Sequence, residues 1–305
     1  MPARTSSSPA SLTRGIAWLL LAVTLFVGQD SLAKFLTTRF PVAQIVWARY
    51  AFHLLAMMPF LIWYGPLRVA TTSQFRLQIL RSLSLLAATV LFNVGLRYLP
   101  LATVTAITFA SPLVITALAA VFLKERVDLP RWAAVFVGFA GVLVVVRPSG
   151  GGFDPIMVCP LAAAVCIGLY QLVTKALSAR DGALTTLFWT GVGGCLAMSP
   201  VLPWAWYRPD AAGWSILAVY GAMGLVSHFM LIRAYRHASA SALAPFFYVQ
   251  LILAILSGVV FFHNLPDVLT LFGAVLICGS GVYVWYRQRF PTYSADTGRR
   301  PRRER

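Results

Sequence analysis

Three charged side chains stand inside long apolar stretches of this 305-residue chain: Asp30, Lys34 and Arg49. Asp30 and Lys34 are four residues apart, which places them one turn apart if the segment is helical. Arg49 lies at a similar depth in the next apolar stretch. One interpretation is a structural ion pair of Asp30 and Lys34 with Arg49 near it. The other is a functional site in which Asp30 takes up a proton or another cation, or contacts a substrate.

Uncharged polar and aromatic residues in other apolar stretches could complete such a site. Buried amides must be hydrogen-bonded or face water, so these residues mark helix interfaces or a cavity. The candidates chosen by depth are Asn93, Ser111, Tyr170, Gln171, Tyr248 and Gln250. Two histidines, His53 and His228, are either packing residues or titrating ones. A cluster of rings could stack on a flat ligand or simply pack, and it consists of Phe109, Tyr170, Phe247 and Tyr248.

The elements that would position these residues are membrane-spanning helices. The composition, 59% hydrophobic and 11% charged, excludes an ordinary soluble surface. A spanning helix needs about 20 predominantly apolar residues. We expect an all-α polytopic membrane protein with ten such helices, at 16–36, 42–64, 78–97, 101–123, 132–147, 155–177, 184–204, 214–235, 241–262 and 267–286. The short connections leave no room for a soluble domain, so the bundle itself must perform the function.

Basic residues predict the orientation of these helices. The chain has a net charge of +16 and 25 Lys and Arg residues. With a cytoplasmic N-terminus, nineteen of them, Arg81 and the five tail arginines included, fall on the cytoplasmic side, and four fall outside. Cytoplasmic loops carry the excess of Lys and Arg in membrane proteins. Both termini are therefore expected in the cytoplasm of a bacterial inner-membrane protein, and the basic tail is expected to bind lipid surface rather than nucleic acid.

The chain also contains an internal repeat. At a shift of 141 residues Gln29–Lys34 falls on Tyr170–Lys175, and at a shift of 139 Gly95–Tyr98 falls on Ala234–His237. Pro112 and Pro245 interrupt the fourth and ninth predicted helices, which correspond to each other. Because five helices is an odd number, the second half should enter the membrane in the opposite sense. The expected boundaries are a tail at 1–13, repeats at 14–149 and 155–288, a periplasmic loop at 150–154 and a basic tail at 289–305.

Several short motifs, together with the two five-helix halves, carry a family resemblance. They are Asp30-Ser31-Leu32-Ala33-Lys34, Trp47-Ala48-Arg49-Tyr50, and Ser111-Pro112 followed by Lys124-Glu125-Arg126. The chain resembles the drug/metabolite transporter superfamily, EamA type, and within it the branch that contains bacterial riboflavin and S-adenosylmethionine transporters. The resemblance implies that helices one, three, four, six, eight and nine line a cavity, with two and seven peripheral, which favours His228 over His53. The family's acidic residue after the ninth helix is replaced by His263-Asn264, so no role is assigned there.

These features favour a secondary transporter that moves a small metabolite by alternating access. The rings favour a flat aromatic substrate such as riboflavin, and the alternative is S-adenosylmethionine or an amino acid. A membrane-embedded enzyme is disfavoured because the sequence has no nucleophile–base pair, metal-ligand cluster or aspartate-rich prenyl-phosphate motif. ATP-driven transport is disfavoured because the sequence has no phosphate-binding glycine loop. A channel is disfavoured because no filter segment is present. No cofactor is expected, and the partners are the substrate and the bilayer. Import or export, proton or cation coupling, and a monomer or homodimer stay open at this stage.

Overall fold

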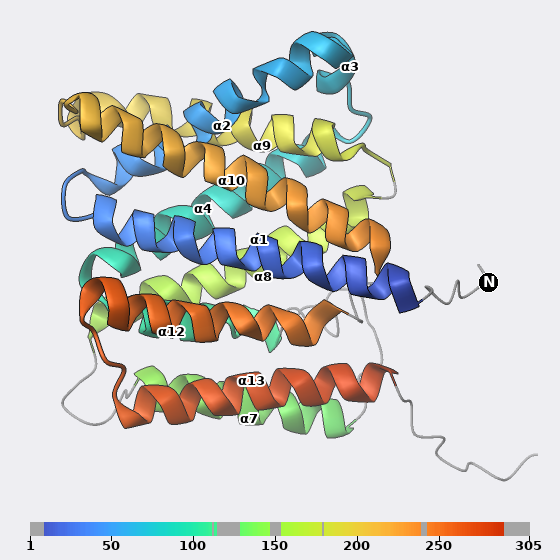
Figure 1. Ribbon diagram of the computed structural model, residues 1–305, viewed down its shortest axis with the longest axis vertical. Helices are drawn as coiled ribbons and strands as arrows, with labels where there is room; N and C mark the ends of the chain where they lie inside the picture. Colours follow the sequence, from blue (N-terminus) through green and yellow to red (C-terminus); the bar gives the residue numbers. More distant parts are fainter. Residues whose placement is uncertain are drawn as a thin grey trace, which may run out of the picture.

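A computed structural model shows the chain as a bundle of helices that run side by side (Figure 1). The structure describes residues 9–111, 113–114, 129–146, 154–178, 180–238 and 243–289, and these residues contain no β-strand. The longer helices are α1 (Pro9–Leu36), α2 (Val42–Tyr64), α4 (Phe75–Tyr98), α5 (Leu101–Thr108), α7 (Leu129–Val146), α8 (Val158–Ser178), α9 (Ala183–Met198), α10 (Ala211–His237), α12 (Val249–Phe262) and α13 (Val268–Arg289). Short helical segments are α3 (Pro66–Ala70), η1 (Pro155–Met157), η2 (Ser199–Trp204) and η3 (Ala244–Tyr248). The predicted all-α class is confirmed.

Seven of these helices are long and apolar enough to cross a membrane, and two shorter apolar helices, Trp132–Val146 and Phe246–Phe262, accompany them. The remaining predicted span, 101–123, begins with α5, but residues 115–128 lie outside the described part of the chain. The Lys124-Glu125-Arg126 motif, Pro112, most of the loop between the repeats, and residues 1–8 and 290–305 of the tails also lie outside it.

Local sequence explains where the elements begin and end. The span predicted at 42–64 matches α2, which begins after Pro41 and ends at Gly65. Gly65 has a φ of +84°, a backbone conformation that side-chain-bearing residues rarely adopt. At α10 the carboxylate of Asp210 caps the first turn by accepting a hydrogen bond from the backbone N–H of Gly213, at 2.7 Å. At Pro245 the chain forms η3, a 3-10 turn that precedes α12.

Helices of one half of the chain pack against helices of the other half. If α1, α2, α4, α5 and α7 correspond in order to α8, α9, α10, α12 and α13, the first helix of each half packs on the third helix of the other, as α1 on α10 and α4 on α8. Likewise α2 packs on α10 and α9 on α4, while α2–α9, α5–α12 and α7–α13 pair corresponding helices. This is the packing expected of two similar halves related by a two-fold axis.

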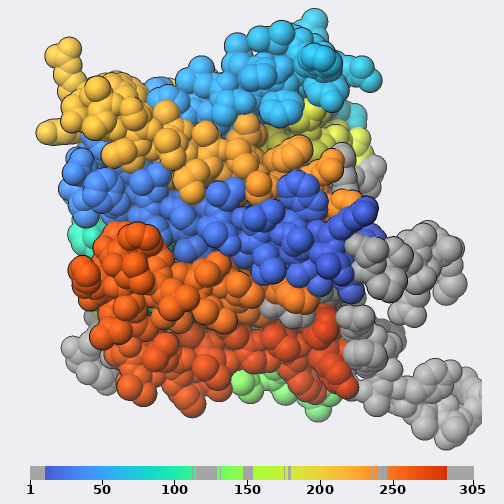
Figure 2. Space-filling model, viewed as in Figure 1, coloured from blue at the N-terminus to red at the C-terminus, as the bar shows by residue number. Residues whose placement is uncertain are grey.

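The outer surface is apolar. Large side chains with high exposed fractions include Ile62 at 77%, Leu129 at 82% and Phe261 at 71%, from three different helices. A soluble protein rarely shows so much contiguous apolar surface, whereas lipid requires it. Figure 2 shows α1, α10, α12 and α13 lying side by side on one such face. A polar functional site is therefore expected inside the bundle.

Candidate functional site

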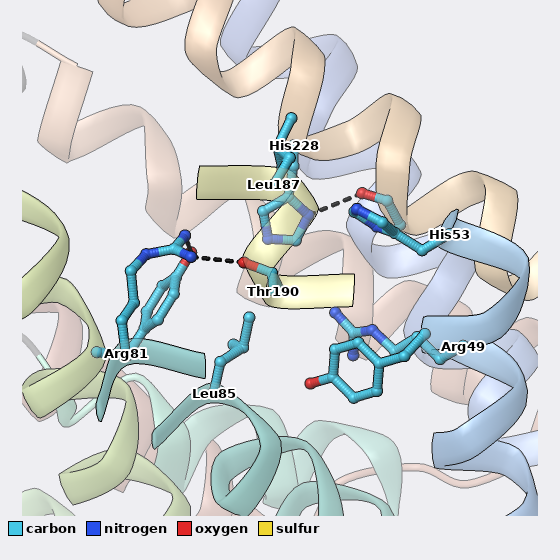
Figure 3. Close-up of a pocket in the computed structure, with 10 residues that line it drawn as sticks. Arg49, His53, Arg81, Leu85, Leu187, Thr190 and His228 are labelled. Atoms are coloured by element: carbon cyan, nitrogen blue, oxygen red, sulfur yellow. Dashed lines mark hydrogen bonds between the residues drawn. The ribbon is translucent and has the colours of Figure 1, made fainter. Parts of the chain in front are cut away.

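Charged and polar side chains meet inside the bundle, in a narrow cavity between α2, α4, α8, α9 and α10 (Figure 3). The residues that line this cavity are Arg49, Tyr50, His53, Arg81, Leu85, Tyr170, Leu187, Thr190, Gly224 and His228. Three residues predicted from the sequence, Arg49, Tyr170 and His228, are thus brought together, along with His53. We call these ten residues the central cavity. It is framed by helices from both halves of the chain.

Arg81 is the most extensively bonded residue of the central cavity. Its side chain is 3% exposed. Its Nε donates to the hydroxyl of Thr174 at 2.8 Å, its Nη1 to the hydroxyl of Thr190 at 2.5 Å and to the carbonyl of Thr186 at 3.3 Å, and its Nη2 to the hydroxyl of Tyr170 at 2.9 Å. The guanidinium carbon also lies 4.6 Å from the centre of the Tyr170 ring. Arg81 therefore joins α4 to α8 and α9.

Arg81 is a site residue that was not predicted from the sequence. It was placed among the nineteen basic residues on the cytoplasmic side because the predicted span begins only three residues before it. In the structure the helix begins at Phe75, and Arg81 is buried. Eighteen basic residues then stand against four, so the bias keeps its direction. Its place within a predicted span was the available signal. Thr174 and Thr190 carried none, because Thr is common in apolar helices.

Arg49 has a different environment, although it faces the same cavity. Its guanidinium interacts with the hydroxyl of Tyr220 and electrostatically with Asp30 and Tyr50. Asp30 in turn lies beside the amide of Gln250. Asn93 is buried next to Tyr220 and donates to the carbonyl of Thr89, at 2.8 Å. Asp30, Asn93 and Gln250 are therefore connected to Arg49 directly or through one neighbour.

Lys34 bonds backbone carbonyls and not Asp30, so the contacts do not support the interpretation of these two residues as a structural ion pair. The Lys34 ammonium donates to the backbone carbonyl of Leu99 at 2.9 Å and to the carbonyl of Leu96. These carbonyls lie at the C-terminal end of α4, where the last turn of a helix leaves C=O groups without partners inside the helix. The counter-charge of Asp30 is Arg49. Lys34 therefore donates hydrogen bonds to carbonyls at the end of a neighbouring helix.

The two histidines present unlike surroundings. His228 Nδ1 lies 2.8 Å from the carbonyl of Gly224, which can only accept, so this nitrogen carries the proton of the hydrogen bond. The ring of Phe26 packs edge-on against His228, with centroids 5.0 Å apart. His53 is 5% exposed, and its Nε2 is buried without a hydrogen-bond partner among the described residues. Sequence reasoning ranked His228 first, but both line the central cavity.

Two rings form a second feature between α5 and α12. Phe109 and Tyr248 correspond to each other at the shift of 139, and their centroids lie 5.7 Å apart with the planes tilted by 46°. Three other predicted residues do not join either feature. Phe247 packs against the apolar cluster of Leu19 and Leu243, and Gln171 is exposed. Ser111 is buried beyond the end of α5.

The two arginines both lie in the first half of the chain, and they are related through the residues that they contact in the second half. Arg49 corresponds to Thr190 at a shift of 141, and Arg81 corresponds to Tyr220 at a shift of 139. Arg81 donates to Thr190, and Arg49 interacts with Tyr220, so each arginine contacts the residue that corresponds to the other. The family resemblance implied that the second and seventh spans are peripheral, but α2 and α9 supply Arg49 and Thr190 to the cavity.

Comparisons with known proteins agree with this architecture. An S-adenosylmethionine uptake transporter of Rickettsia conorii is 29% identical over 275 residues, which are 90% of this chain and 93% of that protein. A riboflavin transporter of Rhizobium johnstonii is 28% identical over 283 residues, 90% of this chain and 92% of that protein. One crystal structure superposes with a TM-score of 0.62 at 17% identity, over 92% of this chain and 98% of its own, which shows the fold alone.

The EamA-like transporter family matches residues 13–147 and 155–286, which are two repeats and nearly the whole chain. The resemblance inferred from the motifs is confirmed, and so is the prediction of a multi-pass membrane transporter for a small metabolite. The protein therefore belongs to the EamA-like transporter family.

Proposed function

We propose that this protein is a secondary transporter of the bacterial inner membrane that works by alternating access. It spans the membrane ten times as two inverted repeats, 14–149 and 155–288, with both termini in the cytoplasm. The exchanged packing of α1 on α10 and of α4 on α8 supports two corresponding halves. Eighteen basic residues against four support the orientation. Inverted repeats that rock about a central site are the usual basis of alternating access.

The observation that carries the proposal is the central cavity itself. Two arginines and two histidines meet between helices of both repeats, inside a bundle whose outer surface is apolar. A charged residue at the centre of a spanning helix costs about 2.5–3.5 kcal/mol on insertion scales, so two of them at one cavity indicate a function. The central cavity is the translocation site, and it is nearly closed in this conformation.

Asp30 is the coupling residue in this proposal. It is partly buried, its counter-charge is Arg49, and Gln250 from the ninth span lies beside it. A carboxylate in this position changes its interaction with Arg49 when it binds a proton or another cation, and Arg49 faces the substrate site. Binding of the ion at Asp30 would therefore alter the charge of the central cavity.

The substrate is a small metabolite with a flat ring system. The Phe109–Tyr248 pair supports this, because two rings packed together between corresponding helices offer an aromatic surface for another ring. Riboflavin and S-adenosylmethionine both contain such a ring, and each is named as the substrate of a relative that covers 90% of this chain. Phe109 and Tyr248 would hold the ring, and the central cavity would hold the polar part.

The test is a transport assay in cells that lack their own uptake systems for the candidate metabolites. Cells that produce the protein should accumulate, or expel, labelled S-adenosylmethionine or riboflavin faster than cells with the empty vector. Aromatic amino acids complete the set. A protein that reaches the membrane at normal abundance yet moves none of these compounds in either direction would contradict the proposed substrate class.

A further inference from the structure

The walls of the central cavity have an uneven charge balance. They carry Arg49 and Arg81 and two histidines, and no acidic side chain. Arg49 has a counter-charge in Asp30, which lies behind it. Arg81 bonds only neutral acceptors, which are hydroxyl groups and one backbone carbonyl, within the described part of the chain. One of the two guanidinium groups therefore has only neutral hydrogen-bond partners among the described residues.

One N–H group of the Arg81 guanidinium has no hydrogen-bond partner among the described residues. A guanidinium has five N–H groups. Those of Nε and Nη1 and one of Nη2 are used on Thr174, Thr186, Thr190 and Tyr170, so a second N–H of Nη2 has no partner among the described residues. These bonds and the Tyr170 ring fix the orientation of the guanidinium before any ligand arrives. A fixed guanidinium recognises a carboxylate better than a flexible cation does.

A second unsatisfied polar atom lies in the same cavity. His53 Nε2 is buried and lacks a hydrogen-bond partner among the described residues, although buried polar atoms are nearly always bonded. His53 lies across the cavity from Arg81, and both guanidinium groups act on it electrostatically (Figure 3). An imidazole nitrogen can bond a carboxylate or an amino group, according to where its proton is. It is an independent indication that this cavity receives a polar ligand.

We propose that Arg81 binds the carboxylate of the transported metabolite, with His53 as the second polar contact, so that the substrates of this protein are carboxylated compounds. This inference rests on the proposed transport function. It favours S-adenosylmethionine, which has a carboxylate, over riboflavin, which has none. It makes Arg81 a specificity-determining residue.

Binding of a carboxylate would also affect the contact between the repeats. Arg81 belongs to the first repeat, and its partners Tyr170 and Thr190 belong to the second. The open N–H of Nη2 belongs to the same guanidinium as these bonds, so a carboxylate bound there contacts the residue that links the repeats. Substrate binding would thus act directly on a contact between the repeats.

The alternative is that Arg81 only ties α4 to α8 and α9. The two roles differ in selectivity, since a structural tie affects all ligands equally. The experiment uses pairs of compounds that differ by one carboxylate: S-adenosylmethionine with its decarboxylated analogue, and tryptophan with tryptamine. Riboflavin is the ring compound without a carboxylate. Uptake and mutual inhibition are measured in proteoliposomes that contain the full-length protein.

The expected result with the unmodified protein is transport of a carboxylated compound, with its carboxylate-free analogue weaker by at least about tenfold, because a hydrogen bond to a charged group is lost. Equal potency of the two members of a pair would overturn the inference, as would transport of riboflavin alone, and in both cases the proposed function would stand. Transport of no compound would overturn the proposed function and this inference with it.

Variants at two arginines of α4 add a second test. Arg81→Gln should weaken the carboxylated compound about tenfold and leave its carboxylate-free analogue unchanged. Arg76→Gln is the matched control, because Arg76 is an exposed arginine near the start of the same helix. An equal loss for both members of a pair in Arg81→Gln would assign Arg81 the purely structural role. If this variant fails to reach the membrane, the comparison of compounds with the unmodified protein decides alone.

Discussion

The ammonium group of Lys34 lies 2.9 Å from the backbone carbonyl oxygen of Leu99, at the end of α4, and does not pair with Asp30 one turn away on its own helix. This contact links α1 to α4 where α4 would otherwise leave carbonyls without partners. Lys34 is therefore bonded elsewhere and not to Asp30, although the spacing of the two residues suggested an ion pair. The consequences for stability can be measured.

Lys34→Met should destabilise the protein by about 1–3 kcal/mol, because the carbonyls of Leu96 and Leu99 lose their donor in an apolar environment. The double variant Asp30→Asn with Lys34→Met should show the sum of the two single effects, since no direct bond joins these residues. The measurement is the melting temperature of the purified protein in detergent. Full recovery of stability in the double variant would support the ion pair of Asp30 and Lys34 that the spacing suggested.

Asp30→Asn should reduce the amount of folded protein, because it leaves the Arg49 guanidinium without its counter-charge. The loss should be smaller than the roughly 3–5 kcal/mol of a fully buried pair, since both side chains are partly exposed. A second change, Arg49→Gln, should recover abundance but not transport, because Arg49 lines the central cavity. Abundance is read by fluorescence of a C-terminal fusion. An active double variant would remove both residues from the mechanism.

Gly281→Ala should impair transport through Tyr248. A Cβ atom at position 281 would lie 1.6 Å from the Tyr248 hydroxyl oxygen, so the ring must move away from its position beside Phe109. Such overpacking costs about 1–3 kcal/mol. Gly279→Ala is the matched control on the same helix, because a Cβ there meets nothing within 4 Å. Transport rates at equal protein abundance should differ between the two, and equal rates would count against a role for the Tyr248 position.

Alanine at Tyr248 or Phe109 should weaken transport of a ring-containing substrate while abundance stays near normal, since each change removes one ring of the pair. Tyr248→Phe keeps the ring and should retain most of the activity. Initial rates at several substrate concentrations separate a loss of affinity from a loss of turnover. Normal transport rates in both alanine variants would show that these rings serve only in packing.

Reporter fusions test the orientation. A phosphatase or fluorescent reporter placed after Gly152, between the repeats, and after Arg289, at the end of α13, should give opposite signals, periplasmic for the first and cytoplasmic for the second. Basic residues partition eighteen against four in favour of this arrangement once Arg81 is assigned to the bundle interior. Identical signals from the two fusions would contradict an odd number of spans in each repeat.

The sequence predicts the helices and the repeat better than it predicts the partners of individual side chains. The bounds of α2 follow from Pro41 and Gly65, and the correspondence of the halves follows from shifts of 139 and 141. These features depend on hydrophobicity and local conformation, which are encoded residue by residue. The shift of 139 also relates Phe109 to Tyr248, which the structure brings into contact.

Partners across helices depend on packing that the sequence does not display. Asp30 and Lys34 have the spacing of an ion pair on one helix, but the approach of α4 offers Lys34 backbone carbonyls, and α2 offers Asp30 an arginine. Arg81 was counted on the cytoplasmic side although it lies inside the predicted span, because hydropathy windows do not locate a helix start to within one turn. A basic residue inside a span, wherever the span begins, is the signal to follow in related chains.

The most direct test of the central claim, that this bundle is a secondary transporter, is counterflow in proteoliposomes. The purified protein is reconstituted into vesicles preloaded with unlabelled S-adenosylmethionine, and a trace of labelled compound is added outside. The account predicts that label accumulates inside above its equilibrium level and then declines, and that Arg81→Gln reduces the overshoot while Arg76→Gln keeps it. Passive equilibration without overshoot in vesicles with the unmodified protein, identical for every compound tried, would show a pore and contradict alternating access.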